Sequence, residues 1–186
     1  MKLRKRQLTF IDLFAGCGGL SLGLEKAGFY PLYVNELNKD ALETYLVNRD
    51  ADYPHLREKY NSRDIKSIIN EQGFFAKLLD DLSQDFGRDF RTNPVDLIAG
   101  GPPCQGFSGI GIRRSYSVDK EQLPSNHLFQ DMAHFVHMIK PKMFLFENKS
   151  TRPSAVMKAL RLCDKEEVFE LVIEKFRIVR TENGIA

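Results

Sequence analysis

The chain alternates between apolar runs of strand type and stretches with helical spacing. "LTFIDLFAG", residues 8–16, ends in glycine, and Leu20, Leu24 and Ala27 follow it on one helical face. "YPLYVNE" and "NKDALETYLVNRD" repeat this order, with Asn38 placed to cap the second helix. This alternation predicts an α/β fold built on a doubly wound, mostly parallel sheet.

The second half continues the pattern. "VDLIAGG" is a near-continuous apolar run of the kind that is buried on both faces of a parallel sheet. We expect residues 52–63 to be irregular, and "DIKSII" to be a short strand or the start of a helix. Further expected elements are a helix at 74–86 that ends near Gly87, a helix at 127–139 and a strand at 142–148. Residues 1–148 are predicted to form one domain, and 149–186 an unassigned tail.

Composition sets the broad class. With 186 residues, 42% hydrophobic and 28% charged, the chain can bury the core of one globular domain. The net charge of +2 does not identify a nucleic-acid binder. The scattered cysteines Cys17, Cys104 and Cys163 form neither a disulfide framework nor a zinc motif. With no signal peptide and no apolar run of about 18 residues, we expect no membrane contact and a cytoplasmic location, or a nuclear one in a eukaryote.

The first glycine turn points to a nucleoside cofactor. "FAGCGG" allows a ligand to approach the backbone, and Glu36 ends the next strand, where an acidic side chain can bind ribose hydroxyls. The dinucleotide pattern fails because Ser21 replaces its third glycine, and no phosphate loop is present. A nucleoside without a pyrophosphate, such as S-adenosylmethionine, therefore fits better, although such glycines can also serve only a tight turn.

A thiol and a carboxyl follow two later strands. In "GGPPCQGFSG" the prolines Pro102 and Pro103 fix the backbone before Cys104, a suitable place for a nucleophile. Glu147 ends "KMFLFEN" and is a candidate acid at the same rim. The alternatives are a small buried cysteine and a solvated carboxyl.

A metal site is a weaker interpretation of the helix at 127–139. His127, Asp131, His134 and His137 have a spacing that could bring some of them to one face. The stretch is explained more simply as an amphipathic packing helix, and no HExxH motif is present. We therefore predict no metal.

Taken together, these segments resemble the cytosine-5 DNA methyltransferases. "DLFAGCGGLSLGLEKAGF" is similar to the cofactor turn of that family, and "VNELNKDALETY" to its ribose-binding segment. "RDI" resembles the adenine-contacting segment, "GGPPCQGFS" the catalytic loop and "FLFEN" the catalytic glutamate strand. The resemblance covers about residues 8–148. It implies a Rossmann-like methyltransferase fold, apparently incomplete, that uses S-adenosyl-L-methionine and releases S-adenosyl-L-homocysteine.

The resemblance also implies roles for individual residues. Cys104 would attack C6 of a cytosine flipped out of double-stranded DNA, while Glu147 would protonate N3 so that C5 accepts the methyl group. Residues 106–120 would form a basic loop at the DNA. The DNA-contacting residues would be Gln105, Ser108, Arg113 and Arg114. The cofactor pocket would use Phe14, Gly16, Gly18, Glu36, Leu37, Asp64, Ile65, Pro103 and Leu128.

Beyond residue 148 the resemblance ends. The Gln-x-Arg-x-Arg element, the target-recognition domain and the C-terminal helix of that family are not evident. The chain could be truncated, could be half of a split enzyme completed by a second chain, or could carry a deletion or frameshift. A half-domain that binds cofactor or a partner without turnover is the main alternative function. A dehydrogenase is disfavoured because its fingerprint is absent.

Overall fold

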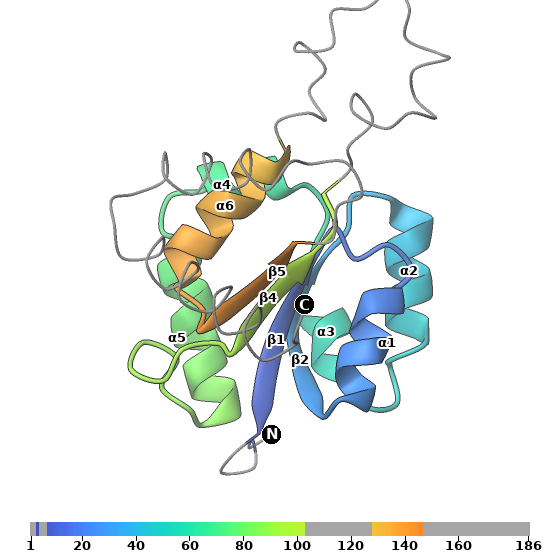
Figure 1. The fold of residues 1–186 in the computed structure, drawn as a ribbon, viewed down its shortest axis with the longest axis horizontal. Coiled ribbons are helices and arrows are strands. Elements are labelled where there is room, and N and C mark those ends of the chain that lie inside the picture. Colours follow the sequence, from blue (N-terminus) through green and yellow to red (C-terminus); the bar gives the residue numbers. More distant parts are fainter. Residues whose placement is uncertain (1–2, 4–6, 103–127, 147–186) are drawn as a thin grey trace, which may run out of the picture.

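A parallel five-stranded sheet forms the centre of the protein (Figure 1). The computed structural model describes residue 3, residues 7–102 and residues 128–146. The strand order is β3-β2-β1-β4-β5, and every neighbouring pair is parallel. The strands are β1 (Leu8–Leu13), β2 (Phe29–Asn35), β3 (Asn61–Ser62), β4 (Leu97–Gly100) and β5 (Met143–Phe146).

Helices cover both faces of this sheet. Figure 1 shows α1, α2 and α3 on one side and α4, α5 and α6 on the other. This arrangement confirms the predicted α/β fold with a doubly wound sheet. The helices are α1 (Gly19–Lys26), α2 (Lys39–Val47), α3 (Pro54–Glu58), α4 (Ile65–Asn70), α5 (Phe74–Phe86) and α6 (Leu128–Ile139).

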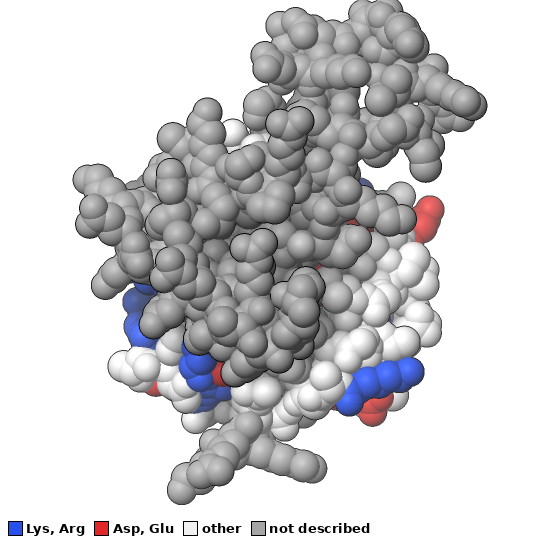
Figure 2. Space-filling model, viewed as in Figure 1, with Lys and Arg blue, Asp and Glu red and all other residues white. Residues whose placement is uncertain are grey.

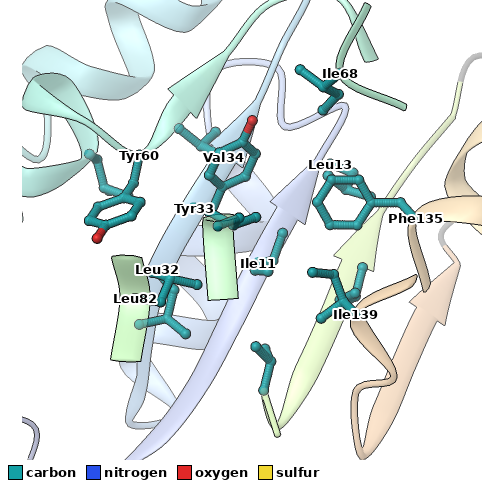
Figure 3. Close-up of a cluster of buried hydrophobic side chains, with 14 of the residues drawn as sticks. Ile11, Leu13, Leu32, Tyr33, Val34, Tyr60, Ile68, Leu82, Phe135 and Ile139 are labelled. Carbon is teal, nitrogen blue, oxygen red and sulfur yellow. The ribbon is translucent and has the colours of Figure 1, made fainter. Parts of the chain in front are cut away.

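Strand residues alternate between two apolar layers, as a two-sided sheet requires. On the side of α5 and α6, Leu82 lies beside Leu32 and Phe135 beside Leu13 (Figure 3). On the opposite side, a smaller cluster joins Phe10, Leu97 and Ala99 of the strands to Leu20 and Leu24 of α1. Burying a leucine, isoleucine or phenylalanine side chain contributes about 1.5–3 kcal/mol to the free energy of folding. The two layers therefore supply most of the favourable free energy.

The helix ends follow their local sequence. The Asn38 side chain accepts hydrogen bonds from the backbone N–H groups of Asp40 and Ala41, which confirms the predicted cap of α2. Gly87 ends α5 with a φ of 66°, a conformation that glycine adopts without strain.

The expectation for residues 52–63 was wrong in part. That stretch contains α3 and β3, with five and two residues respectively, which are too short for a periodic pattern to reveal. "DIKSII" is the start of a helix rather than a strand, because the Asp64 side chain caps α4 by accepting from the N–H of Lys66.

Four strands end in the same row of the sheet. Leu13 pairs with Asn35 and with Gly100, and Gly100 pairs in turn with Phe146. Gly100 is required there, since an added Cβ would lie 2.5 Å from the carbonyl oxygen of Leu13. The chain leaves β1 for β2 on one side and later returns to β4 on the other, so the ends of β1 and β4 form the crevice where such folds bind ligands.

Within the described part of the chain, no helix has the length and apolar character needed to cross a membrane.

Candidate cofactor and catalytic site

The turn after β1 has an unusual backbone. Phe14, Gly16 and Gly18 all have positive φ values, of 59°, 56° and 89°. Such a value is uncommon for a residue with a side chain, and a residue held in this way often marks a functional site. The turn is tied to its neighbours because the Ala15 N–H donates to the Asn35 carbonyl oxygen at 3.1 Å and the Gly18 N–H donates to the Ala15 carbonyl oxygen at 2.9 Å.

Glu36 joins this turn to the end of β2. Its Oε2 accepts a hydrogen bond from the Gly16 N–H at 2.8 Å, and its Oε1 accepts from the Asn38 N–H at 2.7 Å. A carboxylate oxygen has more than one lone pair, so both oxygens can still accept from the hydroxyl groups of a ligand. A Cβ added at Gly16 would meet no heavy atom within 4 Å, so space is open beside the turn. The structure therefore brings Gly16 and Glu36 together.

Three further candidates lie after β2 and β3. Leu37 is 61% exposed, and its carbonyl oxygen accepts from Arg63 Nη2 at 3.1 Å. Asp64 is also exposed, at the start of α4. Ile65 differs from them because it is 3% exposed and belongs to the main core, which leaves little of its surface for a ligand.

The remaining candidates border or lie outside the described residues. Leu128, at the start of α6, is partly buried against the main core. Gly101 and Pro102 come directly after β4, and Pro102 is buried. The predicted residues that lie outside the described part are Pro103, Cys104, Gln105, Ser108, Arg113, Arg114 and Glu147.

A buried network of hydrogen-bonded side chains lies behind the turn, and the sequence interpretation missed it. Asp12 of β1 accepts a hydrogen bond from Ser21 Oγ at 2.5 Å, and Ser21 Oγ lies 2.8 Å from the hydroxyl of Tyr45. Asp12 Oδ1 has no hydrogen-bond partner among the described residues. Burial raises the pKa of the Asp12 carboxyl to about 7, although the hydrogen bond from Ser21 and the charge of Arg49 lower it. The sequence did carry a signal for this network, because an aspartate stands inside the apolar run of β1.

Arg49 completes this buried network from the end of α2. Its Nη2 donates to the Gly18 carbonyl oxygen at 3.0 Å, and its Nε donates to Glu25 Oε1 at 2.6 Å. The guanidinium carbon lies 3.9 Å from the centre of the Tyr45 ring. A Cβ at Gly18 would lie 2.6 Å from Arg49 Nη1 and 2.7 Å from Tyr45 Cδ2, so packing as well as backbone angle requires glycine there.

A pocket of about 530 Å³ lies at the opposite end of the strands, near the start of β1. Arg88 and Lys142 both line it, and both form ion pairs with Asp96 there, at 3.1 and 2.7 Å. The Arg88 guanidinium also donates to the carbonyl oxygens of Gln7, Asn93 and Pro94. These bonds connect the starts of β1 and β4. None of the predicted site residues lines this pocket.

Where Figure 2 shows described residues, their Lys and Arg side chains do not form one continuous patch. The visible Lys and Arg side chains stand in separate groups near the margins of this view, with Asp or Glu nearby. Within residues 7–102 and 128–146, no three His, Cys, Asp or Glu side chains come close enough together to hold a metal ion.

The family is decided by comparison with known proteins. The family described as C-5 cytosine-specific DNA methylase matches residues 8–177. The chain belongs to this family. Among its methylase relatives, M1.HphI, a type II methyltransferase of Haemophilus parahaemolyticus, is 37% identical over 142 residues. M.AgeI, a type II methyltransferase of Thalassovita gelatinovora, is 36% identical over 138 residues.

The similarity covers most of this chain but only part of each relative. It includes 76% of the chain and 32% of M1.HphI, and 74% of the chain and 27% of M.AgeI. The chain thus matches between about a quarter and a third of the length of these two relatives.

Solved structures agree with the fold. A crystal structure assigned to a DNA modification methyltransferase of an E. coli prophage matches 83% of this chain and 37% of its own, with a TM-score of 0.54 and 28% identity. The S. pombe Dnmt2 methyltransferase matches 85% of this chain and 41% of its own with a TM-score of 0.50, and at 21% identity it supports the fold alone.

Proposed function

We propose that this methylase chain is the cofactor-binding and catalytic part of a DNA cytosine-5 methyltransferase. The observation that carries the proposal is the contact between Gly16 and Glu36 at the carboxyl ends of β1 and β2, in a chain of this family. Through that contact, a stretch of backbone that a ligand can approach lies beside a carboxylate that can still accept hydrogen bonds. Residues 1–148 would form this part, and residues 149–186 stay an unassigned tail.

The described residues fit S-adenosylmethionine. Glu36 would accept hydrogen bonds from the ribose hydroxyls, with the open side of Gly16 next to the ligand. Leu37 is exposed beside them and could cover the adenine, with Asp64 at the neighbouring strand end. Phe14 and Gly18 would shape the turn itself, and Pro103 and Leu128 would complete the wall. Ile65, which is buried in the main core, would support this wall from behind rather than contact the ligand. When bound, the cofactor supplies the methyl group and leaves as S-adenosylhomocysteine.

The catalytic residues carry over from the family resemblance. The Cys104 thiolate would form a bond to C6 of cytosine while Glu147 donates a proton to N3. This addition makes C5 nucleophilic, so that it takes up the methyl group. Loss of the C5 proton to a base and release of the Cys104 thiolate from C6 then restore the aromatic ring, and Glu147 recovers its proton from N3.

The substrate would be a cytosine flipped out of double-stranded DNA, because C5 and C6 cannot be reached inside the stacked duplex. Gln105 and Ser108 come after the nucleophile, and Arg113 and Arg114 would pair with phosphates. The described part adds one supporting observation for Glu147, since β5 ends at Phe146 in register with Gly100. The segments that follow β4 and β5 therefore leave the sheet at the same end of the strands.

We further infer that this chain needs more protein to complete the enzyme, either a later segment or a second chain that supplies target recognition. Its match to about a third of M1.HphI supports this inference. Met143 and Leu145 of β5 support it too, because each is 42% exposed although their register neighbours Leu97 and Ala99 are buried. The same observations are also compatible with the alternative function, a half-domain that binds the cofactor or a partner without turnover by itself.

Covalent trapping tests the proposed chemistry. In the complete enzyme, DNA with 5-fluorocytosine at the target should remain linked to the protein, because fluorine at C5 cannot leave as a proton would. Mass spectrometry should find the link on Cys104, and Cys104→Ser should abolish it while cofactor binding persists. A link on Cys17 or Cys163 would refute the assignment of the nucleophile.

A further inference from the structure

Arg49 occupies a position that the proposed chemistry leaves unexplained. It lies just after α2 and is 5% exposed, yet its guanidinium reaches the turn thirty-one residues earlier in the chain. A buried charge is costly unless several partners replace its water. Arg49 has such partners in Glu25 at 2.6 Å, the Tyr45 carbonyl oxygen at 3.2 Å and the Gly18 carbonyl oxygen at 3.0 Å.

These partners belong to three different segments. Glu25 lies on α1, Tyr45 on α2, and Gly18 ends the cofactor turn. The planar guanidinium is suited to this task because its donors point in fixed directions, whereas a lysine offers a single point charge. Arg49 therefore fixes α1, α2 and the turn relative to one another.

The turn needs to be held from outside because its backbone is unfavourable. Phe14 has a positive φ, which is an unfavourable conformation for a residue with a side chain. Glu36 holds the turn from the side of the proposed ligand by binding the Gly16 N–H. Arg49 holds its other end from behind by binding the Gly18 carbonyl oxygen.

We propose that Arg49 is a positioning residue for cofactor binding, which holds Gly18 so that Gly16 faces the ligand. The inference rests on the proposed function, since it assumes a cofactor at this turn. Tyr45 supports the same arrangement: its ring lies under the guanidinium, and its hydroxyl contacts Ser21 in the first turn of α1.

The test compares variants of the full chain in two measurements. Calorimetry gives the affinity for S-adenosylhomocysteine, and amide hydrogen exchange of the free chain reports on residues 14–18. Arg49→Met should weaken binding about tenfold, the effect of losing one hydrogen bond to a charged group, and should speed exchange at the turn. Arg49→Lys should give an intermediate result and serves as the test if Arg49→Met does not fold. Arg57→Met, which removes an exposed arginine paired with Glu43 and Asp50, should change neither measurement.

Glu25→Gln separates positioning from general stability. It removes the ion pair with Arg49 and should lower the melting temperature, but the Gly18 contact remains, so affinity should stay within about twofold of the parent. Wild-type affinity and wild-type exchange in the Arg49 variants would overturn the inference, as would affinities that simply track melting temperature. If the parent chain binds no cofactor, the proposed function fails, and the exchange rates still decide the role of Arg49.

Discussion

Glu36 accepts a hydrogen bond from the backbone N–H of Gly16 at 2.8 Å, so a side chain at the end of β2 fixes the turn after β1. The other oxygen of the same carboxylate accepts from the N–H of Asn38, at the start of α2. One residue thus organises two strand ends and a helix start around the open side of the turn. In the proposed function, the same carboxylate binds ribose.

Gly18→Ala should destabilise the chain strongly. Its φ of 89° disfavours a side chain, and the added carbon would lie 2.6 Å from Arg49 Nη1. The two costs together predict a loss of about 2–4 kcal/mol in the free energy of unfolding, measured by urea denaturation. Gly23→Ala is the matched control, because the new carbon would meet nothing within 4 Å. A Gly18 variant as stable as that control would contradict the geometry of the turn.

Gly100→Ala should also cost stability, for a different reason. The added carbon would lie 2.5 Å from the Leu13 carbonyl oxygen and 3.1 Å from the Met132 side chain. Backbone cannot move aside as a flexible side chain can, so we expect a loss of about 1–3 kcal/mol in the free energy of unfolding. A shift in the thermal midpoint would show it, whereas an unchanged midpoint would mean that β1 and β4 lie farther apart.

Asp12 should make stability depend on pH. Burial raises its folded pKa from the ordinary 3.8 to about 7, so the folded state keeps a proton that the unfolded state has released. The free energy of unfolding should therefore fall as pH rises from about 4 to about 7, by at most about 1.4 kcal/mol per pH unit from this group. Asp12→Asn should remove that contribution. Urea denaturation across this range measures it, and equal slopes for parent and variant would be the contrary outcome.

The isolated chain should transfer few or no methyl groups to DNA. It matches only 32% of M1.HphI, so the surfaces that complete the site and recognise the target would have to come from elsewhere. Incorporation of radiolabelled methyl groups into duplex DNA, with and without the missing part, tests this expectation. Normal turnover by the chain alone would contradict it.

Much of the fold could be predicted because long elements leave periodic signals. In α2, for example, Leu42, Tyr45 and Leu46 are buried, and their spacing of three and four residues is the one that indicates a helix with one apolar face. The short α3 and β3 have no such signal, since they are held by their contacts with β2 rather than by their own pattern. Glu36 could be placed from its strand position, but the partnership of Arg49 and Gly18 could not. That contact depends on where the end of α2 is placed relative to the turn after β1, and no local spacing encodes it.

The central claim, that this turn binds S-adenosylmethionine, is tested most directly by calorimetric titration of the chain. We predict binding of S-adenosylmethionine and of S-adenosylhomocysteine, weakened about tenfold or more in Glu36→Ala through the lost hydrogen bonds to ribose. Glu58→Ala, which changes an exposed glutamate at the end of the short helix α3, should bind as the parent does. No binding of either compound, or binding of NAD in preference to both, would contradict the account.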